Sequence, residues 1–569
     1  PLTANGKVDL DALPKPNVAL PRGEAPQGLQ ETVLAEAWCE VMGLDGVGRE
    51  DGFFELGGSS LQAVAVLERL RRRGFQLSVD ALFRSPTLAA LATQLCTLHA
   101  DSSNTNNAYV PFSLAPEAER EALSSRLPGG LDALEDLYPL GPLQEGMLVH
   151  HRMAECGDVY LDRNLAHFAT RSEFDAYIDA LRQVVSRHPI LRTAFLWRHG
   201  GEPLQAVWRQ VEIPVRAHAL NPSDGPIGER LMAQFDPRHY RIDLEQAPLL
   251  HVHWAVDDAG VAAVTLLHHL VGDHSTMALV QQEVALILAG RSEELPQPLP
   301  FRPYIEMVLE ARRRGDAEAH FRRELGDVDT PTTPYGLHQV WGDGSDITEA
   351  RALLPRNLSQ SLRHTAQHHD VSPAALWHLV WALVCARTSG REDCVFGTVL
   401  MGRLYGGAEA ERALGLFINT LPLRLNLQGL SVSSGLYKVQ QGLADLLPYE
   451  HTSLSLAQQC SGVPAGVPLF TSLLNVRHSE LIQAQDAGTR AIADVTEYER
   501  NNYPLSLSVD DFGQDFGLVL QVAAPISSRR VLALVENAVA RLITALSDDP
   551  QQPLSALEVV PEAERARVL

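Results

Sequence analysis

Apolar residues recur at helical spacing in the first hundred residues of the chain. From Glu31 onward they lie three or four residues apart until a glycine ends the stretch, which predicts an amphipathic helix. A second helix is predicted over residues 61–73. A third is predicted to begin at Ser85, an N-cap residue followed by proline at the first helical position. We therefore expect residues 28–98 to form a small helical bundle.

The pattern changes beyond residue 130, where two periods alternate. Short continuous apolar runs such as VAAVTLL (261–267) are typical of buried strands, whereas longer stretches such as MALVQQEVALIL (277–288) have helical spacing. This mixture predicts a large α/β unit in two lobes, an N-lobe over about 131–300 and a C-lobe over about 301–560.

Two segments show neither period. Residues 13–27 are rich in proline, and residues 99–130 open with a polar tract of serine and asparagine. Such compositions cannot bury enough apolar surface to order themselves, so we interpret both segments as linkers.

Composition narrows the classes of function. The 569 residues include 47 Lys and Arg against 70 Asp and Glu, a net charge of −23, and no basic stretch indicates nucleic-acid binding. The six cysteines show no paired spacing, so neither a disulfide framework nor a zinc site is expected. No apolar run reaches the roughly 20 residues that a membrane span needs, and no signal peptide opens the chain. We expect a cytoplasmic protein that binds neither nucleic acid nor membrane.

The segment DGFFELGGSSL (51–61) places two glycines directly before a predicted helix. Gly57 and Gly58 allow a sharp turn, and Ser59 opens a capping box. Taken alone, the string also fits two serines that only begin a helix. It resembles, however, the signature of peptidyl and acyl carrier proteins, which implies a 4′-phosphopantetheine attached covalently to Ser60 by a phosphopantetheinyl transferase. The phosphodiester of this group would lie near the partial positive charge of the helix N-terminus.

The sequence LLHHLVGDHSTM places His268 and His269 at the exit of a predicted buried strand. A metal site on His268, Asp273 and His274 is disfavoured, because a strand exit followed by a loop does not place ligands on one face. Histidines that only satisfy buried partners are the alternative, which the adjacent pair and the following acid weaken. The string resembles the HHxxxDG motif of condensation-family domains, whose fold is like that of chloramphenicol acetyltransferase.

Six further segments match this family in its order: YPLGPLQEGML (138–148), RHPILRTAF (187–195), DCVFGTVLMGR (393–403), GLFINTLPLRL (415–425), PLFTSLLNVRHS (468–479) and NNYPLSLSV (501–509). The resemblance covers about residues 131–560 and implies that His269, beside His268, is the active histidine. It implies a structural role for Asp273, paired with an arginine, and Arg192 in the second segment is the candidate. His274 stands where the family has glycine.

The chemistry that this resemblance implies is acyl transfer, catalysed by a peptide-bond-forming acyltransferase. An amine attacks a thioester carbonyl and loses a proton as the tetrahedral intermediate forms. The imidazole of His269 is able to take or orient that proton. Because an α-amino group has a pKa near ~8, a useful fraction is already neutral, so positioning matters as much as proton transfer.

A second histidine pair follows directly on the first of these segments. The string HHRMAECGD (150–158) resembles the extra HH[I/L]xxxxGD motif of dual epimerisation/condensation domains, with Arg152 in place of Ile or Leu. An ordinary loop that contains two histidines is the alternative. The resemblance implies that the domain also inverts a Cα from L to D, by removing its proton and returning one to the opposite face. The motif residues are His150, His151, Gly157 and Asp158.

Together these resemblances predict a fragment of a nonribosomal peptide synthetase, of the kind that makes antibiotics, siderophores or lipopeptides. Ser60 is expected to present an upstream aminoacyl or peptidyl thioester as donor, and the acceptor is the amine of an aminoacyl group on a downstream carrier domain. Three alternatives remain: a plain condensation domain, a stand-alone epimerase and a non-catalytic recruitment domain. The segment around Asn419 favours condensation over the stand-alone epimerase, and the intact histidine motif argues against a non-catalytic domain.

Both ends of the chain resemble parts of adenylation domains, which are therefore expected as upstream and downstream partners. PLTANGKVDL (1–10) resembles the last motif of such domains, with Lys7 at the position that contacts the adenylate. PEAERARVL (561–569) resembles the start of the linker to the next one. The expected division is an adenylation remnant (1–12), a linker (13–27), the carrier (28–98), a linker (99–130), the condensation domain (131–560) and a final linker (561–569).

Overall fold

A computed structural model gives the fold of the chain. It describes residues 24–58, 60–85, 87–97, 109–124, 126–154, 156–197, 201–338, 340, 346–403, 412–478, 493–498 and 502–568. The segment that resembles an adenylation motif, with Lys7, lies outside these residues, as does Ser59.

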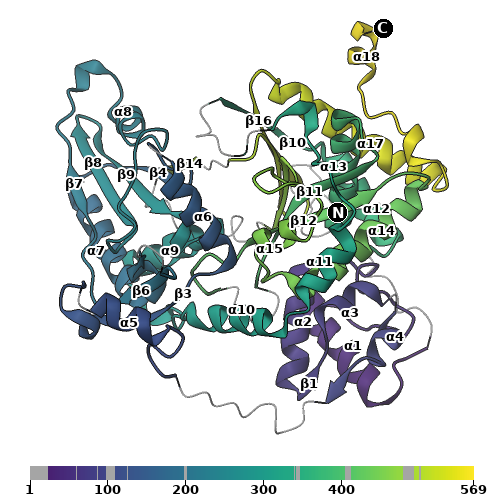
Figure 1. Ribbon diagram of the computed structural model, residues 1–569, viewed down its shortest axis with the longest axis horizontal. Helices are drawn as coiled ribbons and strands as arrows, with labels where there is room; N and C mark the ends of the chain where they lie inside the picture. Colours follow the sequence, from purple (N-terminus) through teal and green to yellow (C-terminus); the bar gives the residue numbers. More distant parts are fainter. Residues whose placement is uncertain are drawn as a thin grey trace, which may run out of the picture.

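The first described domain is the helical bundle that the periodicity predicts (Figure 1, purple). Helices α1 (Gly28–Met42) and α2 (Ser60–Arg72) pack around a core in which Trp38 and Phe53 are almost fully buried. Their rings meet edge to face, with centroids 5.2 Å apart. The smaller elements are β1 (Phe75–Gln76), α3 (Val79–Arg84), α4 (Leu88–Ala92) and β2 (Cys96–Thr97).

The N-lobe is built on a five-stranded sheet with the order β14-β4-β9-β8-β7. Its central strand β9 (Gly260–His268) pairs antiparallel with β4 (Leu161–Phe168) and β8 (Leu250–Asp257). Residues 261–268 are all buried, which explains the continuous apolar run in the sequence. The other N-lobe elements are α5 (Glu117–Ser124), β3 (Leu134–Pro139), α6 (Pro142–Met153), α7 (Arg171–Arg187), β5 (Thr193–Leu196), β6 (Leu204–Trp208), β7 (Val215–Ala217), α8 (Ile227–Gln234) and α9 (His274–Leu288).

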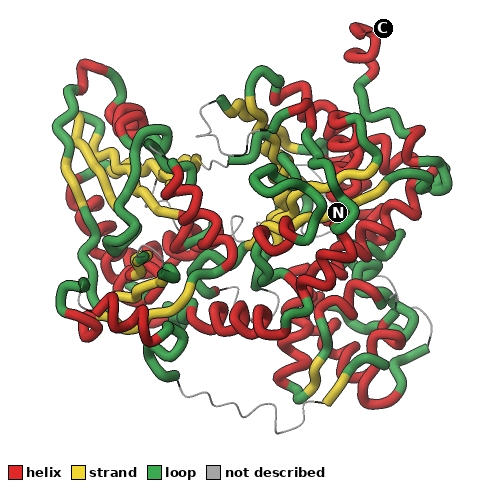
Figure 2. Tube along the Cα trace, viewed as in Figure 1, coloured by secondary structure: helices red, strands yellow, loops and turns green. Residues whose placement is uncertain are grey.

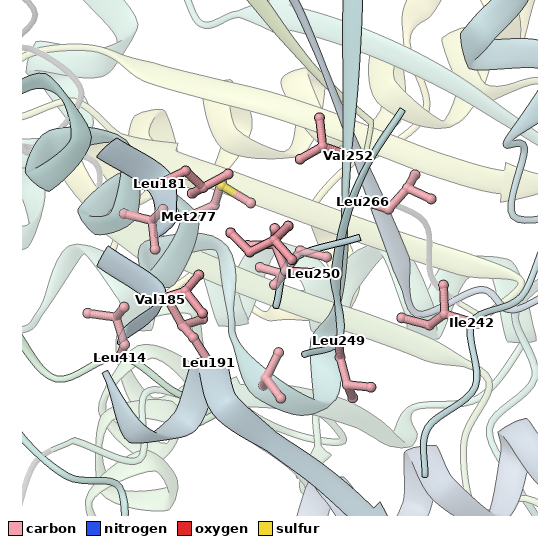
Figure 3. Close-up of a cluster of buried hydrophobic side chains, with 14 of the residues drawn as sticks. Leu181, Val185, Leu191, Ile242, Leu249, Leu250, Val252, Leu266, Met277 and Leu414 are labelled. Carbon is pink, nitrogen blue, oxygen red and sulfur yellow. The ribbon is translucent and has the colours of Figure 1, made fainter. Parts of the chain in front are cut away.

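Helices α7 and α9 supply the apolar side chains that cover this sheet. Leu181 and Val185 of α7 and Met277 of α9 belong to one buried cluster with Leu250 and Leu266 of the central strands, as Figure 3 shows. Burial of this shared cluster fixes α9 against the sheet, and with it the segment that joins β9 to α9.

The C-lobe contains a six-stranded sheet with the order β10-β16-β15-β13-β11-β12. Helix α13 (Pro373–Ser389) packs on it and is buried over nearly its whole length. Figure 2 shows the strands of the two lobes as separate layers flanked by helices. The other elements are α11 (Ala317–Leu325), β10 (Ile347–Leu353), α12 (Arg356–His368), β11 (Asp393–Leu400), β12 (Asn419–Asn426), α14 (Val432–Leu446), α15 (Leu454–Gln459), β13 (Ser472–His478), β15 (Leu505–Asp511), β16 (Phe516–Ala523), α17 (Ser528–Asp548) and α18 (Glu562–Val568).

The lobes exchange segments, so a division near residue 300 does not describe them fully. Strand β14 (Ala493–Tyr498) comes from the C-terminal half of the chain but pairs with β4 of the N-lobe sheet. Helix α10 (Arg302–Arg314) buries Tyr304 and Ile305 in the N-lobe core. No described helix is long and apolar enough to cross a membrane.

The carrier bundle lies against the C-lobe, beneath α11 and α14 in Figure 1. Arg84 forms an ion pair of 2.5 Å with Asp445 on α14. The backbone N–H of Glu55, in the loop before α2, donates to Oδ1 of Asp370 at 2.9 Å. Burial raises the pKa of Asp370 to about 6. The carrier is therefore held by specific polar contacts on the side of the C-lobe.

Candidate functional site

The turn before α2 presents the predicted attachment serine. Gly57 has φ +93°, and a Cβ on Gly58 would lie 2.4 Å from the ring of Phe53. Both glycines are therefore required by the backbone, one for its conformation and one for its packing. Ser60 is the first residue of the 13-residue helix α2, and a helix N-terminus favours a negatively charged phosphodiester. The local geometry fits 4′-phosphopantetheine.

His269 follows the central strand β9 and opens the short 3₁₀ helix His269–Val271. Its backbone N–H donates to the carbonyl of Tyr160 at 2.9 Å, which ties it to the start of β4. Its ring Nδ1 lies 3.2 Å from the carbonyl oxygen of Gly272, and Nε2 lies 3.1 Å from Oδ1 of Asp162. Because both nitrogens face acceptor oxygens, the imidazolium form satisfies both contacts. Asp162 lies on β4, outside all of the sequence motifs described above.

His268 is fully buried and its hydrogen bonds fix its tautomer. Nδ1 accepts the backbone N–H of Leu270 at 3.1 Å, so it carries no proton. Nε2 lies 2.9 Å from Oδ2 of Asp158 and donates its proton to that carboxylate. The first histidine motif is thereby joined to the acidic residue of the second.

Asp158 bridges the two histidine motifs. Its Oδ2 accepts from Nε2 of His268 and from Nδ1 of His151, and its Oδ1 accepts the backbone N–H of Tyr160 at 3.0 Å. Burial alone would raise the pKa of Asp158, but the adjacent His268 and His151 outweigh burial and hold this pKa well below its usual range. The carboxylate is therefore ionised and fully hydrogen-bonded.

Gly157 makes this bridge sterically possible. It has φ +70°, and a Cβ at this position would lie 2.4 Å from the carbonyl oxygen of Arg238. The next N–H, of Asp158, donates to the carbonyl of Pro237 at 2.6 Å. The Gly-Asp pair of the motif is thus a tight turn that directs the carboxylate toward the histidines.

His150 and His151 are adjacent near the end of α6 but have different surroundings. Successive helical residues point about 100° apart, and Nδ1 of His151 reaches Asp158. The ring of His150 packs edge-on against Tyr160, with centroids 5.5 Å apart, and burial lowers the pKa of His150. The second pair therefore contains one residue hydrogen-bonded to the bridge and one packed against an aromatic ring.

The predicted pairing of Asp273 with Arg192 is wrong. Asp273 forms a buried ion pair with Arg403, whose guanidinium lies 3.0 and 3.2 Å from the two carboxylate oxygens. Asp273 also caps α9, because its Oδ1 accepts the N–H of Thr276 at 3.0 Å. Arg192 pairs instead with Glu135 at 2.9 Å. Arg403 ends the matched segment 393–403, so a candidate was present in the sequence, but its proximity to Asp273 depends on how the two halves of the chain pack.

Replacing Arg403 by alanine is expected to lower the free energy of unfolding by about 3–5 kcal/mol, because the buried Asp273 carboxylate would lose its cation. Denaturant unfolding of the full chain, followed by tryptophan fluorescence, measures the change. The exposed Arg530, paired with Glu564, is the control: Arg530→Ala should cost at most about 1 kcal/mol. Equal effects of the two substitutions would contradict the structural role of Arg403.

His151, Asp158 and His268 also form a cluster of potential metal ligands, with their ligand atoms within 4.8 Å of one another. This set differs from His268, Asp273 and His274, the metal site that was weighed and disfavoured from the sequence. A histidine that binds a metal through one nitrogen normally donates a proton from the other. Because Nδ1 of His268 accepts an N–H, binding through Nε2 would require an imidazolate. The hydrogen bonds therefore account for this cluster better than a metal does.

The N-lobe gathers most of the predicted site residues around the exit of β9. His268, His269 and Asp273 lie there, and His151 and Asp158 join them through hydrogen bonds, whereas Arg192 pairs elsewhere. Ser60 lies in the carrier bundle, which contacts the C-lobe. Ser60 and His269 therefore lie in different domains of the chain.

Two family models match the chain. The model described as condensation domain matches residues 134–569, and the phosphopantetheine attachment site model matches residues 32–95. A covalently attached 4′-phosphopantetheine is the cofactor of the second family, and the matched range contains the predicted serine. The carrier domain of this chain thus has this cofactor.

Curated relatives are far longer proteins. Malpinin synthetase of Mortierella alpina is 41% identical over 587 residues, which cover 100% of this chain but 8% of that protein. Malpibaldin synthetase of the same organism is 42% identical over 579 residues, 99% of this chain and 10% of that protein. Surfactin synthase subunit 2 of Bacillus subtilis (strain 168) is 26% identical over 596 residues, 100% of this chain and 15% of that protein. The chain therefore corresponds to a small part of each.

Solved structures agree in fold at low sequence identity. The condensation domain of the monacolin K polyketide synthase matches with a TM-score of 0.59 and 18% identity, covering 74% of this chain and 100% of that chain. The X-domain from teicoplanin biosynthesis matches with a TM-score of 0.60 and 17% identity, covering 74% and 97%. The expected multidomain architecture, a helical carrier followed by a two-lobed α/β domain, is confirmed. From residue 134 onward the chain belongs to the condensation-domain family, and the bundle before it belongs to the family of phosphopantetheine-bearing carriers.

Proposed function

We propose that this chain is the donor carrier and dual epimerisation/condensation unit of a nonribosomal peptide synthetase. Ser60 carries the 4′-phosphopantetheine, whose thiol holds an aminoacyl or peptidyl donor as a thioester. The condensation domain inverts the donor Cα from L to D and then joins the donor to the amine of an aminoacyl group on a downstream carrier. A phosphopantetheinyl transferase and flanking adenylation domains are the partners that this function requires.

The observation that carries the dual function is the Asp158 bridge. In an ordinary loop, the second histidine motif would have no reason to meet the first. Here Oδ2 of Asp158 accepts from both His151 and His268, over a sequence separation of 110 residues from the latter. This favours the dual domain over the plain condensation domain.

For condensation, His269 is the group next to the reacting atoms. Its contacts with Gly272 and Asp162 hold the ring in one orientation, and Nε2 is the nitrogen that we assign to the incoming amine. The amine attacks the donor carbonyl, its proton passes toward His269, and the thiol leaves. Asp273 acts from a distance, because its ion pair with Arg403 and its cap on α9 fix the loop that carries His269.

Loading the full chain with an L-aminoacyl group in deuterated buffer tests the proposal. We expect deuterium at Cα and a D-configured residue, followed by a peptide bond when a loaded acceptor carrier is added. Peptide formation without deuterium or D product would support the plain condensation domain instead. A D donor without peptide formation would support a stand-alone epimerase, and the absence of both reactions a recruitment domain.

A further inference from the structure

We propose that His151 is the second acid–base group of the Cα inversion, that Asp158 positions it, and that His150 does not take part in proton transfer. This inference rests on the proposed epimerisation and assigns it the residue that complements His269. It follows from the hydrogen bonds of His151, His268 and His269 and from the ring packing of His150.

His151 has the arrangement of an oriented general base. Its Nδ1 donates to the ionised Asp158 carboxylate, which leaves the lone pair on Nε2. A carboxylate in this position holds the imidazole in one tautomer and stabilises the imidazolium that forms when the ring accepts a proton. Within the described residues Nε2 of His151 has no hydrogen-bond partner, and the side chain keeps 8% of its surface exposed.

The other two candidates near Asp158 lack this arrangement. His268 is fully buried, and both of its nitrogens are occupied, one by the N–H of Leu270 and one by Asp158. It serves to anchor the carboxylate. His150 packs edge-on against Tyr160, and burial lowers its pKa. His151 is thus the histidine that combines a carboxylate partner on Nδ1 with a lone pair on Nε2, and His269 is the active histidine of the first motif.

His151 and His269 have different hydrogen-bond surroundings. Both nitrogens of His269 face acceptor oxygens, of Gly272 and Asp162, so this ring has contacts suited to holding a proton that it donates, whereas Nε2 of His151 offers a lone pair. Inversion requires one group that accepts a proton and another that supplies one. Nε2 of His151 takes the Cα proton while the C–H electron pair moves into the thioester carbonyl. A proton from Nε2 of His269 then bonds to Cα on the opposite face, and exchange with water resets both rings.

Enantiomer-specific exchange tests the assignment. The loaded full chain, bearing an L- or a D-aminoacyl group, is placed in deuterated buffer, and Cα deuterium and configuration are measured by mass spectrometry and chiral chromatography. We expect His151→Gln to lower inversion by at least about 100-fold. The His151→Gln variant should no longer exchange the Cα proton of one enantiomer. It should still exchange the Cα proton of the other enantiomer, because His269 is intact. His269→Gln should show the opposite preference, and Asp158→Asn should weaken the same exchange as His151→Gln.

His150→Gln, the same substitution at the neighbouring residue, is the control. We expect this variant to retain Cα exchange of both enantiomers. Peptide formation from a preloaded D donor should persist in His151→Gln, which shows that the domain is folded. Inversion at the wild-type rate in His151→Gln would overturn this inference and leave the proposed epimerisation intact. Equal loss of both exchanges together with peptide formation would assign His151 a structural role and also overturn it. Absence of any exchange in the wild-type chain would overturn the proposed epimerisation and this inference together.

Discussion

Ser60→Ala is expected to abolish phosphopantetheine loading completely, and with it inversion and peptide bond formation. The attachment needs a hydroxyl at the start of α2, where the helix N-terminus favours the phosphodiester. The substitution removes that hydroxyl and leaves the preceding glycine turn unchanged. Incubating the full chain with a phosphopantetheinyl transferase and coenzyme A, followed by intact-protein mass spectrometry, should show one added group in the wild type and none in the variant.

The neighbouring Ser59 supplies the matched control. Ser59→Ala makes the same chemical change one residue earlier in the same string, so it should still accept one group. Loading of Ser60→Ala, or failure of Ser59→Ala alone, would move the attachment to Ser59. Both substitutions leave the contacts of Glu55 and Arg84 with the C-lobe in place.

The local elements of the chain were predictable because local patterns determine them. The strand over 261–267 and the helix over 277–288 are present as β9 and α9, since a fully buried strand and a helix facing the core need different apolar spacing. The start of one predicted helix was wrong. The helix expected from Ser85 begins at Leu88, and its N-cap is Thr87, whose side chain accepts the N–H of Ala90. Threonine is also a favourable N-cap, so the pattern alone did not select between the two.

The candidate site was predictable only within its motifs. Each histidine pair could be found in the sequence, but the carboxylate that joins them could not, because Asp158 and His268 meet only after α6 packs beside the exit of β9. The same limit explains the wrong partner of Asp273, since Arg403 lies 130 residues away in the C-terminal half. Contacts between motifs depend on tertiary packing, and neither spacing nor residue type encodes that packing locally.

The exchange of segments between lobes shows the same limit on a larger scale. Strand β14 contributes to the N-lobe sheet from position 493, beyond most of the C-lobe. An edge strand gains hydrogen bonds from any compatible partner, and the sequence pattern of a strand does not specify which sheet it joins. The pairing nevertheless matters for the site, because its partner β4 also carries Asp162, the carboxylate beside His269.

His269→Gln is expected to lower the rate of peptide bond formation by about 10²–10⁴-fold, the range typical for loss of a positioned acid–base group. Glutamine cannot exchange a proton near neutral pH, although it can still form hydrogen bonds. The rate should be measured in single turnover from a preloaded D donor and a loaded acceptor carrier, so that inversion does not enter the measurement. Full activity would contradict the role of His269, and His364→Gln, an exposed change on α12, is the control.

Asp162→Asn separates proton transfer from positioning at the same ring. Asparagine keeps an oxygen that can accept from Nε2 of His269 but removes the negative charge that favours the imidazolium. If proton transfer dominates, the variant should change the pH dependence of peptide formation, because it removes the negative charge beside the nitrogen that exchanges the proton. If His269 acts only by holding the amine in place, the rate should change by a constant factor at every pH. Since an α-amino group is already partly neutral near pH 8, the change should be clearest below pH 7, where the amine depends most on a base.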